Sequence, residues 1–219
     1  MTRGTFALML TAVVMLVTAT MNAGGWAVVT VDDLPACVEV GNPTALAFTV
    51  RQHGRTPLSG LKASIDATSG SLKVAAQAVA AQKPGQYTAT IVVPSPGEWI
   101  VTIDSGFLGT RLTLLPLIAV EPGAPAPVLS REAQGQQLFV AKGCITCHTN
   151  TVASSNRSLQ YAQQLIPHKY QDEFLSRILA NPSATLPPRF EFPQMPNLDL
   201  QPGEISALVA FINSGNRPR

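Results

Sequence analysis

Short runs of alternating apolar and polar residues fill the chain from about residue 26 to residue 116. A period of two places one face of each predicted strand in a core. The clearest runs cover residues 46–50, 87–93, 99–103 and 112–114. Segments rich in Pro, Gly, Asn and Ser separate the runs and are typical of turns. About seven strands over about 90 residues predict a small antiparallel β-sandwich of the immunoglobulin-like type.

The periodicity changes to that of helices after Ser130, a residue suited to capping a helix. A second helix is expected near residues 172–180, with Phe174, Leu175, Ile178 and Leu179 buried, and Asn181-Pro182 should end it. A last helix should begin at Pro202 and end at Gly215. Its apolar face consists of Ile205, Leu208, Val209 and Ile212. The C-terminal part is therefore predicted to be all-α.

Alternating proline and alanine near residues 121–127 indicate a semi-rigid linker between the two patterns. The predicted organisation is a β-sandwich domain at 24–115, a linker at 116–129 and a helical domain at 130–219. Hydrophobic residues make up 46% of the chain and charged residues 13%, which is a globular composition and not a disordered one. A formal net charge of +2 gives no indication of nucleic-acid binding.

The first 23 residues have the layout of an export signal. Arg3 supplies a positive charge, residues 6–20 carry none, and small residues follow at 23–25. This pattern predicts a secretory signal peptide. The alternative is a retained membrane anchor at residues 6–23, at the short limit for crossing a bilayer. In either case we expect the remaining chain in the periplasm or on the outer face of the cytoplasmic membrane.

The chain has three cysteines, and two of them lie in Cys144-Ile145-Thr146-Cys147-His148. C-x-x-C-H is the attachment signature of c-type haem. The two thiols form thioethers with the porphyrin vinyl groups, and the adjacent histidine is the proximal iron ligand. A thiol–disulfide redox pair would be expected in a βαβ setting. A structural zinc site would need further ligands at suitable spacing, and neither His53 nor His168 provides it. A chance occurrence of the short motif is the third alternative.

The C-terminal 90 residues resemble class I c-type cytochromes. The resemblance rests on the segments 135–144 and 195–205, with Gly135 and Phe139 on the first helix and Phe211 on the last. It implies one covalently bound haem c, with Cys144 and Cys147 as thioethers and His148 as proximal ligand. It also implies Met195 as the distal iron ligand, and the other four methionines all lie within residues 1–21. His168 is the competing ligand, and core packing is the other role open to Met195.

One further expectation concerns the surroundings of the haem. Arg189, in the proline-bounded loop at 187–196, could pair with a haem propionate, because a guanidinium suits carboxylates. An ordinary solvated arginine is an equally good interpretation.

The N-terminal part resembles the YtkA-like and FixH-like exported β-sandwich domains, on the segments 25–31, 48–54 and 85–90. Proteins of this group often accompany copper-handling or terminal-oxidase genes, but the resemblance implies only the fold and not a metal site. A copper site would need His and Met ligands. This domain offers His53 and Cys37, with no methionine after Met21. We therefore expect His53 to be a hydrogen-bonded turn residue and Cys37 a buried thiol.

These observations predict an electron carrier without substrate chemistry. Its partners would be a redox donor, a redox acceptor and a membrane respiratory or photosynthetic complex onto which the sandwich docks. One alternative is a haem enzyme or gas sensor, which would need an open coordination position. The other is a copper-delivery or assembly factor.

Overall fold

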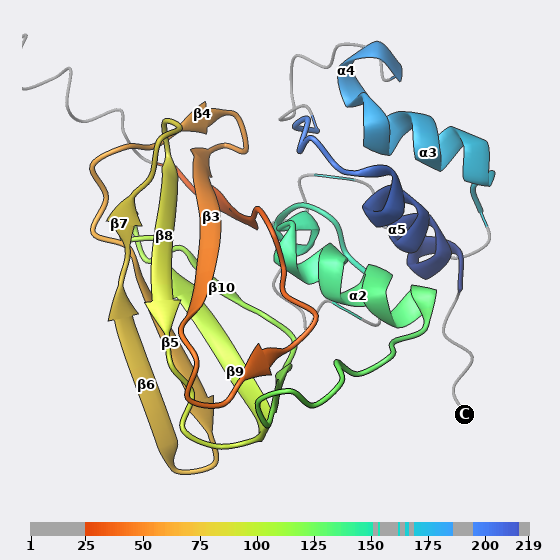
Figure 1. The fold of residues 1–219 in the computed structure, drawn as a ribbon. Coiled ribbons are helices and arrows are strands. Elements are labelled where there is room, and N and C mark those ends of the chain that lie inside the picture. Colours follow the sequence, from red (N-terminus) through yellow and green to blue (C-terminus); the bar gives the residue numbers. More distant parts are fainter. Residues whose placement is uncertain are drawn as a thin grey trace, which may run out of the picture.

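The computed structural model describes residues 25–150, 153, 162, 165–166, 169–185 and 195–214. Strands occupy the first half and helices the second, so the predicted two-part architecture is confirmed (Figure 1). The export segment at 1–23, His168, Arg189 and Gly215 lie outside the described residues. Within the described residues, no helix has both the length and the apolar character needed to cross a membrane.

The N-terminal strands form two facing sheets. The first sheet has the order β1-β3-β8-β7, with β4 paired to β3, and the second has the order β2-β11-β9-β5-β6, with β10 paired to β9. The first contains β1 (Ala27–Val31), β3 (Thr44–Gln52), β4 (Thr56–Pro57), β7 (Val79–Ala80) and β8 (Gln86–Ile91). The second contains β2 (Val38–Glu39), β5 (Ser64–Ser69), β6 (Leu72–Gln77), β9 (Gly97–Asp104), β10 (Arg111–Thr113) and β11 (Leu117–Val120).

Aromatic side chains fill the space between the sheets. Phe48, Tyr87 and Trp99 are almost fully buried, and the Phe48 and Tyr87 rings stack with their centroids 5.9 Å apart. The Tyr87 hydroxyl donates to the Leu58 carbonyl at 2.7 Å and accepts from the Leu61 amide at 3.0 Å. The Trp99 indole donates to the Ser95 carbonyl at 3.0 Å. The large rings therefore supply apolar area to the core without leaving a buried polar atom unpaired.

Two details of the sandwich differ from the sequence prediction. β2 and β11 pair in parallel, whereas the other described strand pairs are antiparallel. β11 also lies within the segment 116–129 that was predicted as linker. Leu117 and Ala119 are buried there against the sandwich core, so the strand continues five residues beyond the boundary at 115.

The helical part contains α2 (Arg131–Ala141), the short 3-10 turn η1 (Cys144–Thr146), α3 (Asp172–Ala180), α4 (Pro182–Thr185) and α5 (Pro202–Ser214). The Ser130 hydroxyl accepts from the Ala133 amide at 3.2 Å, which confirms it as the cap of α2. Pro202 is the first residue of α5, as predicted. α3 ends at Ala180, before Asn181-Pro182, which is also the predicted position.

The burial predicted for Phe174 is wrong. Phe174 is 37% exposed, whereas Leu175 and Leu179 are buried in the helical core. Leu175 and Leu179 are four residues apart and share one stripe of α3, while Phe174 and the half-buried Ile178 share the neighbouring stripe. The apolar face is therefore broader than the surface that the rest of the helical domain covers.

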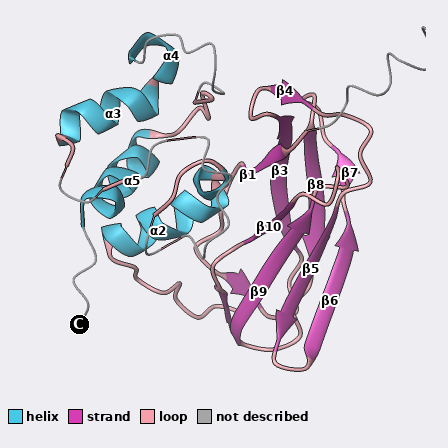
Figure 2. Ribbon diagram, turned by 180° about the vertical axis from the view of Figure 1, so that it is seen from behind, coloured by secondary structure: helices cyan, strands magenta, loops and turns pink. Residues whose placement is uncertain are grey.

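The helical core is organised by the crossing of α2 and α5 (Figures 1 and 2). Gly135 of α2 lies directly against the Ala207 carbonyl and the Phe211 side chain of α5. One turn further on, the Phe139 and Phe211 rings meet at 5.5 Å between centroids, tilted by 56°. A residue without a side chain at the closest point lets the two backbones approach, and the aromatic pair fills the space beside it.

We expect Gly135→Ala to destabilise the helical domain by about 1–3 kcal/mol, because the added Cβ would overlap the α5 backbone and force the helices apart. Gly203→Ala is the matched control, since no atom lies within 4 Å of a Cβ at that position of α5. Chemical denaturation of the full chain, followed by circular dichroism, measures both. Equal stabilities of the two variants would contradict the close crossing.

Candidate functional site

The cysteine motif forms a tight turn immediately after α2. Gly143 has a φ of 74°, a left-handed conformation that ends the helix and redirects the chain. The Cys144 carbonyl then accepts from the Cys147 amide at 3.2 Å and the His148 amide at 2.9 Å. The turn therefore places two thiols and an imidazole-bearing residue on a single short loop. Cys144, Cys147 and His148 therefore lie together on this turn.

Both thiols of the turn are partly buried and form no disulfide. Burial raises the pKa of Cys144 to about 12 and that of Cys147 to about 11. The proximity of Cys147 contributes to the shift at Cys144. The two groups are therefore neutral thiols at neutral pH in the absence of a bound group. Among the described residues, no group of three or more His, Cys, Asp or Glu side chains is placed to hold a metal ion.

Met195 reaches the same part of the helical domain from the other end of the sequence. It is partly buried, and both Met195 and Cys144 pack against the apolar cluster at the centre of the helices. The fully buried members of that cluster are Phe139, Leu175, Leu179, Leu208, Val209, Phe211 and Ile212. The α2–α5 crossing thus gives both segments a common apolar neighbour.

The loop that carries Met195 is ordered by local hydrogen bonds. The Asn197 side chain accepts from the Asp199 amide at 3.0 Å, and Asp199 has a φ of 51°. The Glu204 carboxylate accepts from the Gln201 amide at 3.0 Å, which is one half of a capping box at the start of α5. The end of the loop is therefore joined firmly to the helix that follows it.

The residues of this site fit a covalently bound haem c. They supply two thiols at C-x-x-C spacing, an adjacent histidine, a methionine thioether and an apolar cluster next to them. In c-type cytochromes two cysteines hold the porphyrin through thioether bonds, and a histidine imidazole and a methionine sulfur ligate the iron. An apolar surrounding keeps water from the haem. This chemistry would be supplied by the helical domain alone.

The other sequence predictions have mixed outcomes. His53 has a φ of 52° in the β3–β4 turn, and its amide donates to the Trp26 carbonyl at 3.0 Å, so the predicted hydrogen-bonded turn is confirmed. Cys37 is a free thiol but only partly buried, which is less than expected. His168 and Arg189, as noted, lie outside the described residues, and their predicted roles are untested.

Sequence reasoning missed Lys142, which lies two residues before Cys144 and is only 3% exposed. Its ammonium group lies 2.8 Å from the Glu204 carboxylate of α5 and donates to the Asp32 carbonyl of the sandwich at 2.8 Å. A lysine beside a glycine at a helix end is typical of solvent-exposed positions. The residues around Lys142 in the sequence do not indicate that the sandwich domain covers this lysine.

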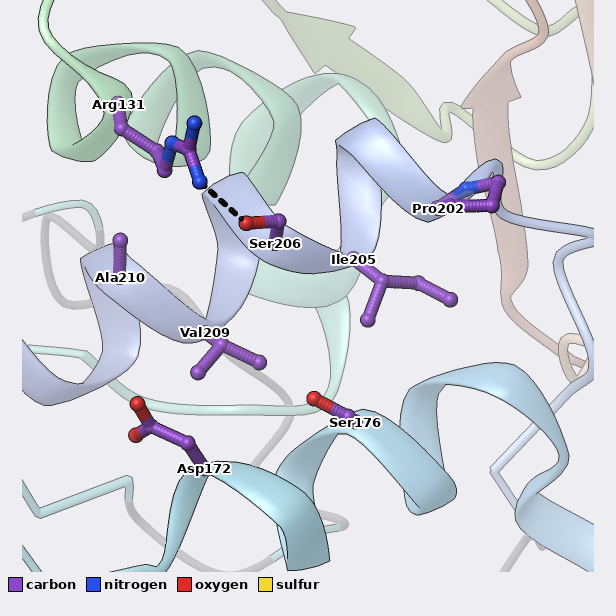
Figure 3. A pocket seen from close by; sticks show the side chains of 8 residues that line it. All are labelled: Arg131, Asp172, Ser176, Pro202, Ile205, Ser206, Val209 and Ala210. Carbon is purple, nitrogen blue, oxygen red and sulfur yellow. Dashed lines mark hydrogen bonds between the residues drawn. The ribbon is translucent and has the colours of Figure 1, made fainter.

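A separate pocket of about 330 Å³ lies where the first residues of α2 and α3 approach α5 (Figure 3). Arg131 reaches across it to donate to the Ser206 hydroxyl at 2.8 Å, and Asp172 lies on the opposite wall. Its lining consists of Arg131, Asp172, Ser176, Pro202, Ile205, Ser206, Val209 and Ala210. The lining contains no Cys, His or Met, so this pocket is not the redox site.

Comparison with known proteins assigns only the helical half. No curated protein matches the chain. Among solved structures, it is similar to the native conformation of E. coli alpha-2-macroglobulin, with 14% identity and a TM-score of 0.33. That match covers 45% of this chain and only 6% of the other, and it carries no conclusion about the sandwich. The family model described as cytochrome c matches residues 132–216. Residues 132–216 are therefore a c-type cytochrome domain, which carries a covalently attached haem c, and Cys144 and Cys147 have the spacing of its attachment motif.

Proposed function

We propose that this protein carries single electrons on one haem c and catalyses no substrate chemistry of its own. The observation that carries the proposal is the turn after α2, which joins Cys144, Cys147 and His148 on one loop beside the cluster that Met195 also contacts. Cytochrome c domains transfer electrons between redox proteins, so a donor and an acceptor are implied.

In this proposal each residue of the site has a distinct role. Cys144 and Cys147 would hold the haem by thioether bonds, and His148 and Met195 would ligate its iron through a ring nitrogen and a thioether sulfur. Arg189 is proposed as a partner of a propionate. When bound, the haem supplies an iron that accepts and releases one electron.

The choice between a carrier and a haem enzyme or gas sensor depends on Met195. A thioether ligand favours ferrous iron, which raises the reduction potential, and it fills the coordination position that an enzyme or sensor would keep open. The partial burial of Met195 against the helical cluster supports a fixed position for this side chain. A closed, six-coordinate site suits electron transfer better than binding of a small molecule.

Export is the second part of the proposal. The charge at Arg3 and the uncharged run at 6–20 support delivery to the periplasm or to the outer face of the cytoplasmic membrane, where C-x-x-C-H proteins are matured.

We further propose a membrane respiratory or photosynthetic complex as the partner, with the sandwich beside it. A copper-delivery role has less support, because the sandwich has no methionine and no cluster of metal ligands among its described residues.

The double variant Cys144→Ser/Cys147→Ser should lose covalent haem completely, while Cys147→Ser alone should retain weakened attachment through one thioether. Haem staining after denaturing electrophoresis measures this directly. Cys37→Ser is the matched control and should stain like the parent protein. Staining that survives in the double variant would refute the assignment of the motif.

Met195→Ala should keep the haem attached but lower its reduction potential, within the roughly 0.8 V range over which axial ligands set haem potentials. The ferric parent protein should show a weak far-red sulfur-to-iron band that the variant lacks. His168→Ala serves as the control, and it should change neither the band nor the potential. An unchanged potential in Met195→Ala would exclude this residue as a ligand.

Fractionation of cells that express the full chain should place the haem-stained protein outside the cytoplasm. Mass spectrometry of that protein then distinguishes the two forms of the N-terminus, because cleavage near Ala23 removes the apolar run and an anchor retains it. Replacement of Arg3 and interruption of the apolar run at 6–20 with charges should abolish haem attachment by blocking export. Normal attachment in that variant would contradict the export proposal.

A further inference from the structure

β1 is buried on both of its faces, although it is an edge strand of its sheet. Ala27, Val29 and Val31 face the sandwich core. Val28 and Thr30 point to the opposite side, where the helical domain lies, and they are also almost fully buried. The Thr30 hydroxyl lies 3.5 Å from the Lys142 carbonyl. The helical domain therefore covers the outer face of this strand and is not merely tethered to the sandwich.

The first contact of this interface lies beside the cysteine motif. A Cβ on Gly143 would lie 2.6 Å from the Val29 carbonyl and 2.7 Å from a Val28 methyl, so the turn before Cys144 rests directly on β1. The Lys142 ammonium joins the Asp32 carbonyl to the Glu204 carboxylate. The proximal end of the site is thus fixed to the sandwich by close packing and by a buried charge.

The second contact lies beside Met195. The β3–β4 turn of the sandwich presents Gly54 to Pro196, and a Cβ on Gly54 would lie 3.6 Å from the Pro196 ring. The turn itself is held by the Gly54 amide, which donates to the Arg51 carbonyl at 3.2 Å, and by the His53 amide bond to Trp26. A well-ordered turn therefore lies against the residue that follows the proposed distal ligand.

Arg51 adds an electrostatic contact to the same loop. Its guanidinium interacts electrostatically with two carboxylates, that of Asp32 on the sandwich and that of Asp199 on the Met195 loop. Burial lowers the pKa of Arg51, and the two carboxylates oppose that shift. Arginine stays charged at neutral pH, so the attraction across the boundary persists. Its Nη1 is buried, with no hydrogen-bond partner among the described residues.

We propose that the β-sandwich positions the distal methionine: Arg51 and the β3–β4 turn hold the 195–199 loop in place, while β1 holds the turn before Cys144. The inference rests on the proposed role of Met195 as a ligand. Arg51 is accordingly a positioning residue that acts through the loop. Weakening its attraction to Asp199 should let the loop open more often, and each opening exposes the distal coordination position.

The test measures the rate at which cyanide binds to the ferric form of the full-length, haem-loaded protein. Arg51→Gln should bind cyanide roughly tenfold faster than the parent, which lies within the usual range of coupling between sites. Arg51→Lys keeps the charge and should stay closer to the parent. Arg111→Gln is the matched control, because Arg111 is an exposed sandwich arginine paired with Asp104 at 2.8 Å. Its cyanide rate should equal that of the parent.

A second variant tests the same contact from the helical side and leaves the sandwich sequence untouched. Asp199→Asn removes the charge but accommodates the positive φ at this position, which asparagine tolerates well. It should reproduce the faster binding of Arg51→Gln, and the double variant should be no faster than either single variant. Parent-like rates in both single variants, or fully additive effects in the double, would overturn the inference.

The far-red sulfur-to-iron band separates this inference from the proposed function. If the parent protein lacks the band, Met195 is not the ligand, and both the ligand assignment and the positioning proposal fail. If the parent has the band and Met195→Ala loses it, the ligand assignment holds whatever the Arg51 variants do. In that case unchanged cyanide rates in Arg51→Gln and Asp199→Asn would refute only the positioning role of the sandwich.

Discussion

The close contact between Gly135 and the α5 backbone sets the geometry of the helical domain. Because Gly135 has no side chain, α2 lies directly against the Ala207 carbonyl and the Phe211 side chain of α5. The end of α2 then delivers the cysteine motif, and the start of α5 anchors the loop from Met195. Two segments far apart in sequence meet the same apolar cluster because of this single crossing.

The second organising feature is the surface between the two domains. It combines apolar packing at Val28 and Gly143 with a buried lysine whose ammonium joins the Asp32 backbone carbonyl to the Glu204 carboxylate. The Asp32 carboxylate is itself bound within the sandwich by Thr49 and Gln86, at 2.9 Å and 2.7 Å. A buried charge is tolerated only where such partners are in place, so this network also favours one relative placement of the domains. The sandwich is therefore structurally part of the redox site's surroundings.

The parts that could be predicted from sequence are those encoded locally. The Cys144–His148 motif, the Ser130 cap and Pro202 at the start of α5 each depend on neighbours within a few residues. The structure confirms the cap and the helix start, and the cytochrome c match covers the motif. The alternation of apolar and polar residues predicted the strands of the sandwich from local sequence in the same way. Lys142, Arg51 and the outer face of β1 could not be identified, because their burial depends on a domain that is distant in sequence. The prediction for Phe174 on α3 was wrong for the converse reason, since none of the described residues covers its apolar side chain.

The shielding of the Lys142 ion pair affects how the protein responds to ionic strength. Mobile ions weaken attraction between solvent-exposed charges within about a Debye length, but they reach a side chain that is only 4% exposed far less. Added salt would thus leave the Lys142–Glu204 pair in place, and with it the ammonium that donates to the Asp32 carbonyl across the domain boundary. The packing around the cysteine turn should therefore change little as ionic strength varies.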